Sequence, residues 1–132
     1  MLDSGNRISS NILVVDDDDD IRATLSELLA ADGYPVATAA NGRDALEYLH
    51  SHDHPCFVLL DMTMPVMSGW EFLKERTRSA HLQRVPVVLM SANMDLLRMD
   101  DLKLFDRLTK PFEFEAVKRL AGKYCESRKV TP

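Results

Sequence analysis

The stretch Cys56-Phe-Val-Leu-Leu-Asp-Met-Thr-Met-Pro-Val-Met-Ser-Gly69 decides how this chain folds. Cys56 to Leu60 is a short continuous apolar run, which is typical of a strand buried on both faces of a parallel sheet. Pro65 cannot continue a strand ladder, and Ser68-Gly-Trp-Glu71 has the pattern of a capping box that begins a helix. Asp61 is therefore predicted at the carboxyl end of a strand, where open α/β sheets bind their ligands.

The same alternation of buried strand and amphipathic helix recurs along the chain. Further strands are predicted at Asn11–Val15, Pro35–Ala39, Val85–Met90 and Leu104–Leu108. Helices are predicted after the run Asp16–Asp20, after Asn41-Gly42, near Ser68, over Asn93–Asp101 and around Val117–Tyr124. Strands that alternate with helices favour an α/β fold, here a doubly wound five-stranded parallel sheet covered on both faces.

Length and composition limit the classes of function. A chain of 132 residues is expected to form one domain, with residues 1–10 as a flexible lead, 11–126 as the domain and 127–132 as a C-terminal tail. The formal net charge of −5 and the absence of a Lys/Arg cluster argue against direct nucleic-acid binding. No apolar run reaches the length of a membrane span, and no signal peptide is recognisable.

The two cysteines, Cys56 and Cys125, are too few for a disulfide scaffold. We therefore expect two reduced thiols and a cytoplasmic location.

Polar side chains follow four of the predicted strands. Because parallel strands end at one edge of the sheet, we expect Asp16, Asp17, Asp61, Ser91 and Lys110 to converge there. Clustered carboxylates repel unless a hard divalent cation binds them, and Mg²⁺ fits a site with few protein ligands. Phosphoryl transfer suits such a site, because it needs mainly alignment and charge neutralisation.

Roles follow for the individual residues. Asp16 and Asp17 are the predicted metal ligands, and Asp61 is the predicted nucleophile. Lys110 is expected to contact one phosphoryl oxygen and the Ser91 hydroxyl another, while the small Ala92 leaves room for access.

The sequence resembles the receiver domains of two-component response regulators from Ile12 to about Tyr124. The resemblance rests on five motifs: Ile12-Leu-Val-Val-Asp-Asp17, Ala40-Asn-Gly-Arg-Asp-Ala-Leu46, Asp61-Met-Thr-Met-Pro-Val-Met-Ser-Gly69, Met90-Ser-Ala92 and Lys110-Pro-Phe112. It implies a flavodoxin-like (βα)5 fold with strand order 2-1-3-4-5. It also implies a signalling domain rather than an enzyme, one that receives a phosphoryl group on Asp61 from a sensor histidine kinase or a phosphotransfer protein.

The resemblance further implies that the Thr63 backbone carbonyl binds Mg²⁺, together with Asp16, Asp17 and Asp61, and that the Lys110–Pro111 bond is cis. Ser91 and Ala92 would belong to a two-state switch that responds to phosphorylation. The segment 91–110 departs from the family pattern, because it is short and carries Arg107 where the family has a switch aromatic residue. A guanidinium cannot enter an apolar slot without a partner, so we expect Arg107 to stay at the surface and the protein to stay monomeric.

Three alternatives remain at this point. The short tail after Cys125 favours a stand-alone receiver, but a receiver from a longer regulator or hybrid kinase would share the same motifs. A haloacid-dehalogenase-like phosphatase with Asp16 as nucleophile is disfavoured, because the chain is short and no acidic pair follows Lys110.

Overall fold

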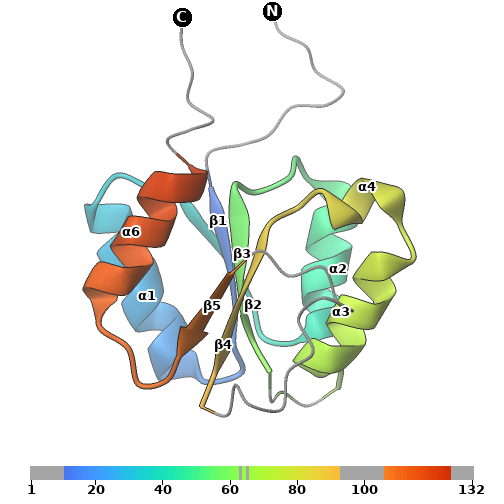
Figure 1. Cartoon of the computed structure of the whole chain (residues 1–132), viewed down its shortest axis with the longest axis horizontal. Helices are drawn as coiled ribbons and strands as arrows, with labels where there is room; N and C mark the ends of the chain where they lie inside the picture. Colours follow the sequence, from blue (N-terminus) through green and yellow to red (C-terminus); the bar gives the residue numbers. More distant parts are fainter. Residues whose placement is uncertain (1–10, 63, 65, 93–105, 126–132) are drawn as a thin grey trace, which may run out of the picture.

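A parallel five-stranded sheet forms the centre of the molecule (Figure 1). The computed structural model describes residues 11–62, 64, 66–92 and 106–125. Within them the strands are β1 (Ile12–Val15), β2 (Val36–Ala39), β3 (Phe57–Asp61), β4 (Val87–Ser91) and β5 (Asp106–Thr109). Their order is β2-β1-β3-β4-β5 and every neighbouring pair is parallel, which confirms the predicted fold class and strand order.

Helices cover both faces of this sheet. They are α1 (Asp19–Ala31), α2 (Gly42–Ser51), α3 (Gly69–Thr77), α4 (Ala80–Gln83) and α6 (Phe114–Tyr124). Figure 1 shows α1 and α6 on one side of the sheet and α2, α3 and α4 on the other. The one-turn helix α4 was not predicted, and the helix predicted over Asn93–Asp101 lies outside the described residues.

Burial along the strands explains why some strands have a continuous apolar sequence and others do not. β1 and β3 are buried along their whole length, because both faces are covered, and both read as continuous apolar runs. The edge strands β2 and β5 are only partly buried, so polar residues such as Asp106 and Arg107 are tolerated there. Two apolar clusters, one on each face, hold the helices to the sheet.

Side-chain caps mark the starts of α1 and α3. Asp18 caps α1 by accepting hydrogen bonds from the backbone N–H groups of Asp20 and Ile21, and Gly33 follows that helix with a φ of 97°. Ser68 and Glu71 form the predicted capping box of α3. These caps fix where each helix starts relative to the preceding strand.

The predicted reduced state of the cysteines is wrong, because Cys56 and Cys125 form a disulfide with a Cα–Cα distance of 5.1 Å. The two residues are 69 positions apart in sequence. Cys56 directly precedes β3 and Cys125 directly follows α6, which runs antiparallel to the strands. The fold therefore brings both to the amino-terminal edge of the sheet, and spacing alone could not show this. Among the described residues, none of the helices is long and apolar enough to cross a membrane.

Candidate functional site

The strand register assembles the site at the carboxyl edge of the sheet. Val15 pairs with Leu60, so the next residues on the two strands, Asp16 and Asp61, are neighbours. On the other side of β3, Ser91 pairs with Thr109. The Lys110 backbone N–H donates to the Ser91 carbonyl at 3.0 Å, which extends the pairing by one residue. Residues far apart in sequence are thus placed together by register.

Three carboxylates lie together at this edge. Ligand oxygens of Asp16, Asp17 and Asp61 all lie within 4.8 Å of one another. Asp16 and Asp61 are buried, with 1% and 7% of their surface exposed, whereas Asp17 is exposed. The cluster is therefore open to solvent on the Asp17 side.

Lys110 supplies the positive charge of the cluster. Its Nζ donates to Asp61 Oδ1 at 2.8 Å and lies 3.9 Å from Asp16 Oδ2. Burial of Lys110 disfavours its charged form, but the hydrogen bond to Asp61 and the charges of the three carboxylates outweigh burial and raise the pKa of Lys110. The ammonium therefore stays protonated beside Asp61.

Asp16 is the least compensated of the three carboxylates. Its Oδ1 accepts a hydrogen bond from the Asp18 backbone N–H at 2.9 Å, whereas its Oδ2 is buried without a hydrogen-bond partner among the described residues. Burial is the main cause that raises the pKa of Asp16, and the charges of Asp61 and Asp17 add to it. A buried carboxylate oxygen without a donor is an unfavourable feature unless a cation binds it.

These residues fit a divalent cation. Three carboxylates against one ammonium leave a net formal charge of −2, and the orphaned Asp16 oxygen offers a hard ligand. Mg²⁺ prefers such oxygen ligands and keeps several waters, which the exposed Asp17 side allows. Thr63, the predicted backbone ligand, lies outside the described residues.

Backbone features around the site hold its loops in place. The Lys110–Pro111 peptide bond is cis, the arrangement that the family resemblance implies. A Cβ at Gly69 would lie 2.7 Å from the Asp61 carbonyl oxygen, so only glycine lets α3 begin this close to the end of β3.

Ser91 is half-buried at the end of β4, Ala92 is exposed beside it, and Arg107 is exposed on β5.

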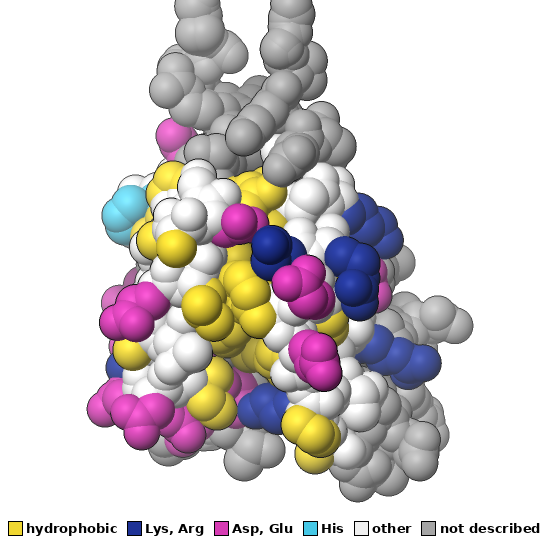
Figure 2. Space-filling model, turned by 90° about the vertical axis from the view of Figure 1, so that its left-hand side faces the viewer, with side chains coloured by type: hydrophobic (Ala, Val, Ile, Leu, Met, Phe, Trp, Pro, Cys, Tyr) yellow, Lys and Arg dark blue, Asp and Glu magenta, His cyan; other side chains and the backbone are white. Residues whose placement is uncertain are grey.

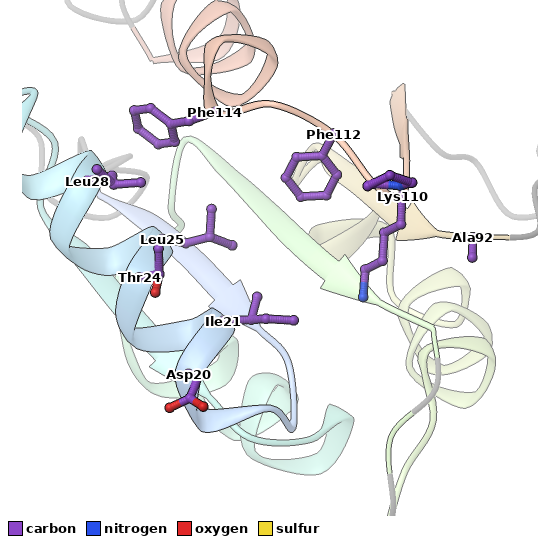
Figure 3. A pocket seen from close by; sticks show the side chains of 10 residues that line it. Asp20, Ile21, Thr24, Leu25, Leu28, Ala92, Lys110, Phe112 and Phe114 are labelled. Carbon is purple, nitrogen blue, oxygen red and sulfur yellow. The ribbon is translucent and has the colours of Figure 1, made fainter.

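An apolar groove adjoins the carboxylates between α1 and α6. Its volume is about 610 Å³, and Lys110 belongs to both the groove and the site. Figure 2 shows hydrophobic side chains gathered in a furrow on this face of the molecule. In Figure 3 the Lys110 nitrogen lies by the tip of β3, and Ile21, Leu25, Phe112 and Phe114 line the groove.

The groove was missed at the level of sequence, although one signal pointed to it. Ile21, Leu25, Leu28 and Leu29 share a face of α1, and that face is wider than its packing on the sheet requires. Leu25 and Leu29 are buried in the core, while Leu28 remains 40% exposed and lines the groove.

Comparisons with known proteins agree with this site. Residues 12–121 match the family model described as the response regulator receiver domain. The chain is 39% identical over 109 residues to the regulatory protein AtoC of Escherichia coli, covering 80% of this chain and 23% of that protein. It is 34% identical over 120 residues to sporulation initiation phosphotransferase F of Bacillus subtilis, covering 89% and 94%.

A solved structure shows the same relationship. The response regulator protein TrrA from Thermotoga maritima, in complex with Mg²⁺ and BeF, superimposes with a TM-score of 0.75 and 31% identity, covering 86% of this chain and 97% of that one. The family match excludes the haloacid-dehalogenase-like alternative. The fold, the carboxylate cluster with its lysine and the match over residues 12–121 show that this chain belongs to the response regulator receiver family of two-component signalling proteins.

Proposed function

We propose that this domain accepts a phosphoryl group on Asp61 from a sensor histidine kinase or a phosphotransfer protein and passes the signal on by changing its partner interactions. The observation that carries this proposal is the 2.8 Å contact between Lys110 Nζ and Asp61 Oδ1 within the carboxylate cluster. Asp61 ends the central strand β3 and has a neighbouring strand on each side. A nucleophile at this position has its charge partner and its metal ligands around it.

Each residue has a role in the proposed transfer. Asp61 attacks the phosphorus atom through a carboxylate oxygen, and the bond from phosphorus to the donor imidazole nitrogen breaks. Lys110 offsets negative charge on the transferred group, and the Ser91 hydroxyl donates to another of its oxygens. Asp16, Asp17, Asp61 and the Thr63 carbonyl would hold Mg²⁺, which neutralises charge on the phosphoryl oxygens and helps to align them.

The groove between α1 and α6 is the proposed place for the phosphodonor to dock. A donor protein that brings its phosphoryl group to Asp61 must cover the carboxyl edge of the sheet, and the apolar groove begins at that edge. An amphipathic helix fits an apolar groove of this kind. The acidic residue Asp20 on α1 and the Lys110 ammonium lie at the groove margin and would set the orientation of the partner.

The switch and the setting of the domain complete the proposal. Ser91, Ala92 and Arg107 form the proposed switch, with residues 11–126 as the receiver unit. Catalytic turnover is limited to self-phosphorylation from small donors and self-dephosphorylation. We place the domain in the cytoplasm. Disulfides in that compartment are usually transient or redox-sensing, so a reversible role is the first to consider for the Cys56–Cys125 bond.

The test is incubation with acetyl phosphate and Mg²⁺, followed by intact mass measurement and site mapping. The protein should gain the mass of one phosphoryl group on Asp61, and Asp61→Asn should abolish the gain. Asp53→Asn is the matched control, since Asp53 is an exposed carboxylate outside the cluster. Phosphoryl label on Asp16, or label that persists in Asp61→Asn, would overturn the assignment.

A further inference from the structure

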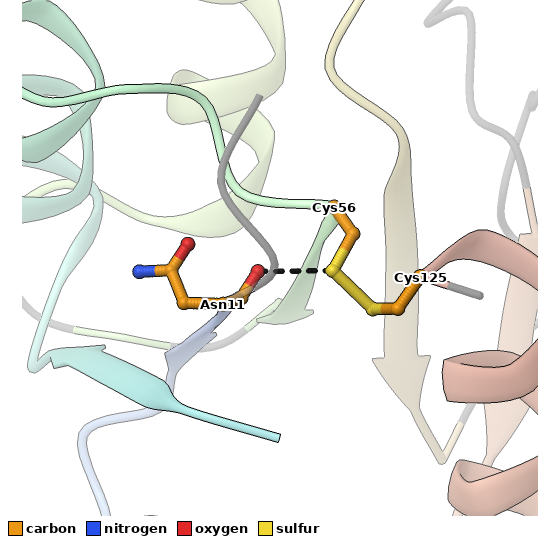
Figure 4. Close-up of a disulfide and its surroundings, with 3 residues drawn as sticks. All are labelled: Asn11, Cys56 and Cys125. Atoms are coloured by element: carbon orange, nitrogen blue, oxygen red, sulfur yellow. Dashed lines mark hydrogen bonds between the residues drawn. A yellow bond between two sulfur atoms is a disulfide. The ribbon is translucent and has the colours of Figure 1, made fainter. Parts of the chain in front are cut away.

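The disulfide lies at the opposite end of the sheet from the carboxylate cluster. Cys56 precedes β3, and Asp61 ends that same strand after five residues, a separation of about 16 Å at the usual strand rise. Cys125 is the C-cap residue of α6. The bond therefore ties the end of the last helix to the start of the central strand (Figure 4).

Both cysteines are closed to solvent. Cys56 and Cys125 have 0% and 1% of their surface exposed and belong to the same apolar cluster. Thiol–disulfide exchange requires a thiolate to reach one of the sulfur atoms, so part of the structure must open first. The end of α6 is the candidate for that opening. The last C=O groups of a helix have no hydrogen-bond partner within the helix, so its last turn frays at low cost.

The reduced form has a place in the same fold. Cys56 Sγ lies 3.1 Å from the Asn11 carbonyl oxygen, which can accept a hydrogen bond from the thiol S–H once the disulfide is broken (Figure 4). Buried thiols pack as small hydrophobic groups, and both would remain inside the apolar cluster. After reduction the Cys56 thiol therefore has a hydrogen-bond partner, and reduction need not unfold the domain.

The disulfide adds to several other contacts near the end of α6. Val117, Leu120 and Ala121 pack on the sheet, while beyond them Lys123 and Tyr124 reach Asp106 Oδ2 at 3.3 and 3.4 Å. The contacts with Asp106 are partly exposed and add little stability, while the Tyr124 ring also packs against the Phe57 ring, with centroids 5.6 Å apart. The same helix begins with Phe114, which lines the groove beside the phosphoacceptor site.

We propose that Cys56 and Cys125 form a reversible redox site that controls how firmly α6 is held to the sheet, with the last turn of α6 opening to admit the reductant. A dithiol reductant attacks one sulfur through its thiolate and forms a mixed disulfide. Its second thiol then displaces the protein sulfur. Two protein thiols result, and the reductant leaves as its own disulfide, so two electrons and two protons pass to the protein. The inference goes beyond phosphoryl transfer and does not depend on Asp61.

The experiment treats the 132-residue chain with dithiothreitol or with its oxidised form and counts free thiols by alkylation and mass. Hydrogen exchange is then compared between the two states. Reduction should expose two alkylatable thiols and speed amide exchange in residues 114–125 about tenfold or more, because the covalent tie between the end of α6 and the start of β3 is lost. Residues 57–61 should lose less protection than residues 114–125, since β3 is buried along its whole length.

Two variants serve as matched controls. Cys125→Ser and Cys56→Ser should each show fast amide exchange in α6 whether or not dithiothreitol is present. In the rest of the domain, their amide exchange should match that of the reduced wild type. Two free thiols in the oxidised sample would overturn the proposal. So would reduction that proceeds only at the rate of global unfolding. Asp61 phosphorylation is scored in the same samples, and its failure would leave these readouts unaffected.

Discussion

The five consecutive aspartates Asp16 to Asp20 have four different roles, and only two of them face the site. Asp16 and Asp17 belong to the carboxylate cluster. Asp18 caps α1, Asp19 pairs with Arg22 on the exposed surface, and Asp20 lies in the first turn of the helix beside the groove. The boundary between site and cap falls where the strand ends and the helix begins.

Replacing Asp17 should weaken Mg²⁺ binding. Asp17→Ala removes one of the three carboxylates that converge at the site, and we expect its affinity for Mg²⁺ to fall about tenfold or more. Asp20→Ala removes an equal charge from the neighbouring helix turn and should change the affinity less than twofold, roughly the effect of a screened surface charge. Isothermal titration calorimetry at fixed ionic strength measures both. Equal losses in the two variants would indicate a diffuse acidic patch rather than a defined site.

Asp16 should make the stability of the metal-free protein depend on pH. The pKa of Asp16 is raised in the folded state, mainly by burial, so the folded state binds its proton more tightly than the unfolded state does. The stability that protonated Asp16 contributes to the folded state is fully present below the ordinary Asp pKa of 3.8. It is lost as pH rises through the raised pKa of the folded state. Asp16→Asn should therefore increase the free energy of unfolding at pH 7 in a chelator, and the gain should shrink as pH falls toward 3.8.

Urea unfolding of both proteins across this pH range, with and without Mg²⁺, measures the effect. Saturating Mg²⁺ at pH 7 should reverse the order, because wild type gains binding free energy that the variant lacks. If Asp16→Asn were less stable than wild type in chelator at pH 7, the ionised Asp16 carboxylate would not be destabilising the metal-free fold.

The connection from α3 through α4 to β4 depends on one buried cation. Arg76 is fully buried, and its Nη2 donates to the carbonyl oxygens of Gln83 at 3.1 Å and Val85 at 2.8 Å. Burial lowers the pKa of the Arg76 guanidinium to about 10, which leaves it charged at neutral pH. The side chain thereby ties the end of α3 to the residues that lead into β4.

Arg76→Ala should destabilise the domain by about 2–4 kcal/mol, because it leaves a buried and a part-buried carbonyl group without their charged donor and opens a cavity. Arg78→Ala, at the C-cap of α3, is the control, since its side chain is 77% exposed and forms its ion pair with Glu75 among the described residues. The control should stay within about 0.5 kcal/mol of wild type. Chemical denaturation measures both, and a loss below about 1 kcal/mol in Arg76→Ala would show that the connection is held by apolar packing alone.

The molecule as a whole offers little apolar surface for self-association in the described residues. The exposed large hydrophobic side chains, Leu28, Val66 and Trp70, lie on α1, in the loop after β3 and on α3. The groove between α1 and α6 is proposed for the phosphodonor, and Arg107 leaves a charged, exposed side chain on β5.

We therefore expect the protein to remain monomeric with and without beryllofluoride and Mg²⁺, as measured by light scattering after size exclusion. A control with Arg107→Tyr places an aromatic side chain on the β5 surface and is expected to raise the tendency to associate. A shift of wild type to the dimer mass with beryllofluoride would show that an ordinary dimer face survives with Arg107.

Local signals in the sequence determined the elements and the edge at which the site lies. The continuous apolar runs of β1 and β3 arise because those strands are covered on both faces, and the capping residues Asp18 and Ser68 satisfy backbone groups a few positions away. Because parallel strands end at one edge, the sequence alone predicts that Asp16, Asp61, Ser91 and Lys110 lie together. Edge strands such as β5 carried a weaker pattern, since only one of their faces requires apolar residues.

Only the tertiary structure decided which distant residues actually meet. The disulfide between Cys56 and Cys125, the groove between α1 and α6 and the tie from Arg76 to Val85 depend on how helices pack on the sheet. The same holds for the orphaned oxygen of Asp16, which results from register and burial together. Periodicity and caps report on neighbours in sequence, whereas these features join surfaces whose relative position is set by the side-chain volumes of the whole core.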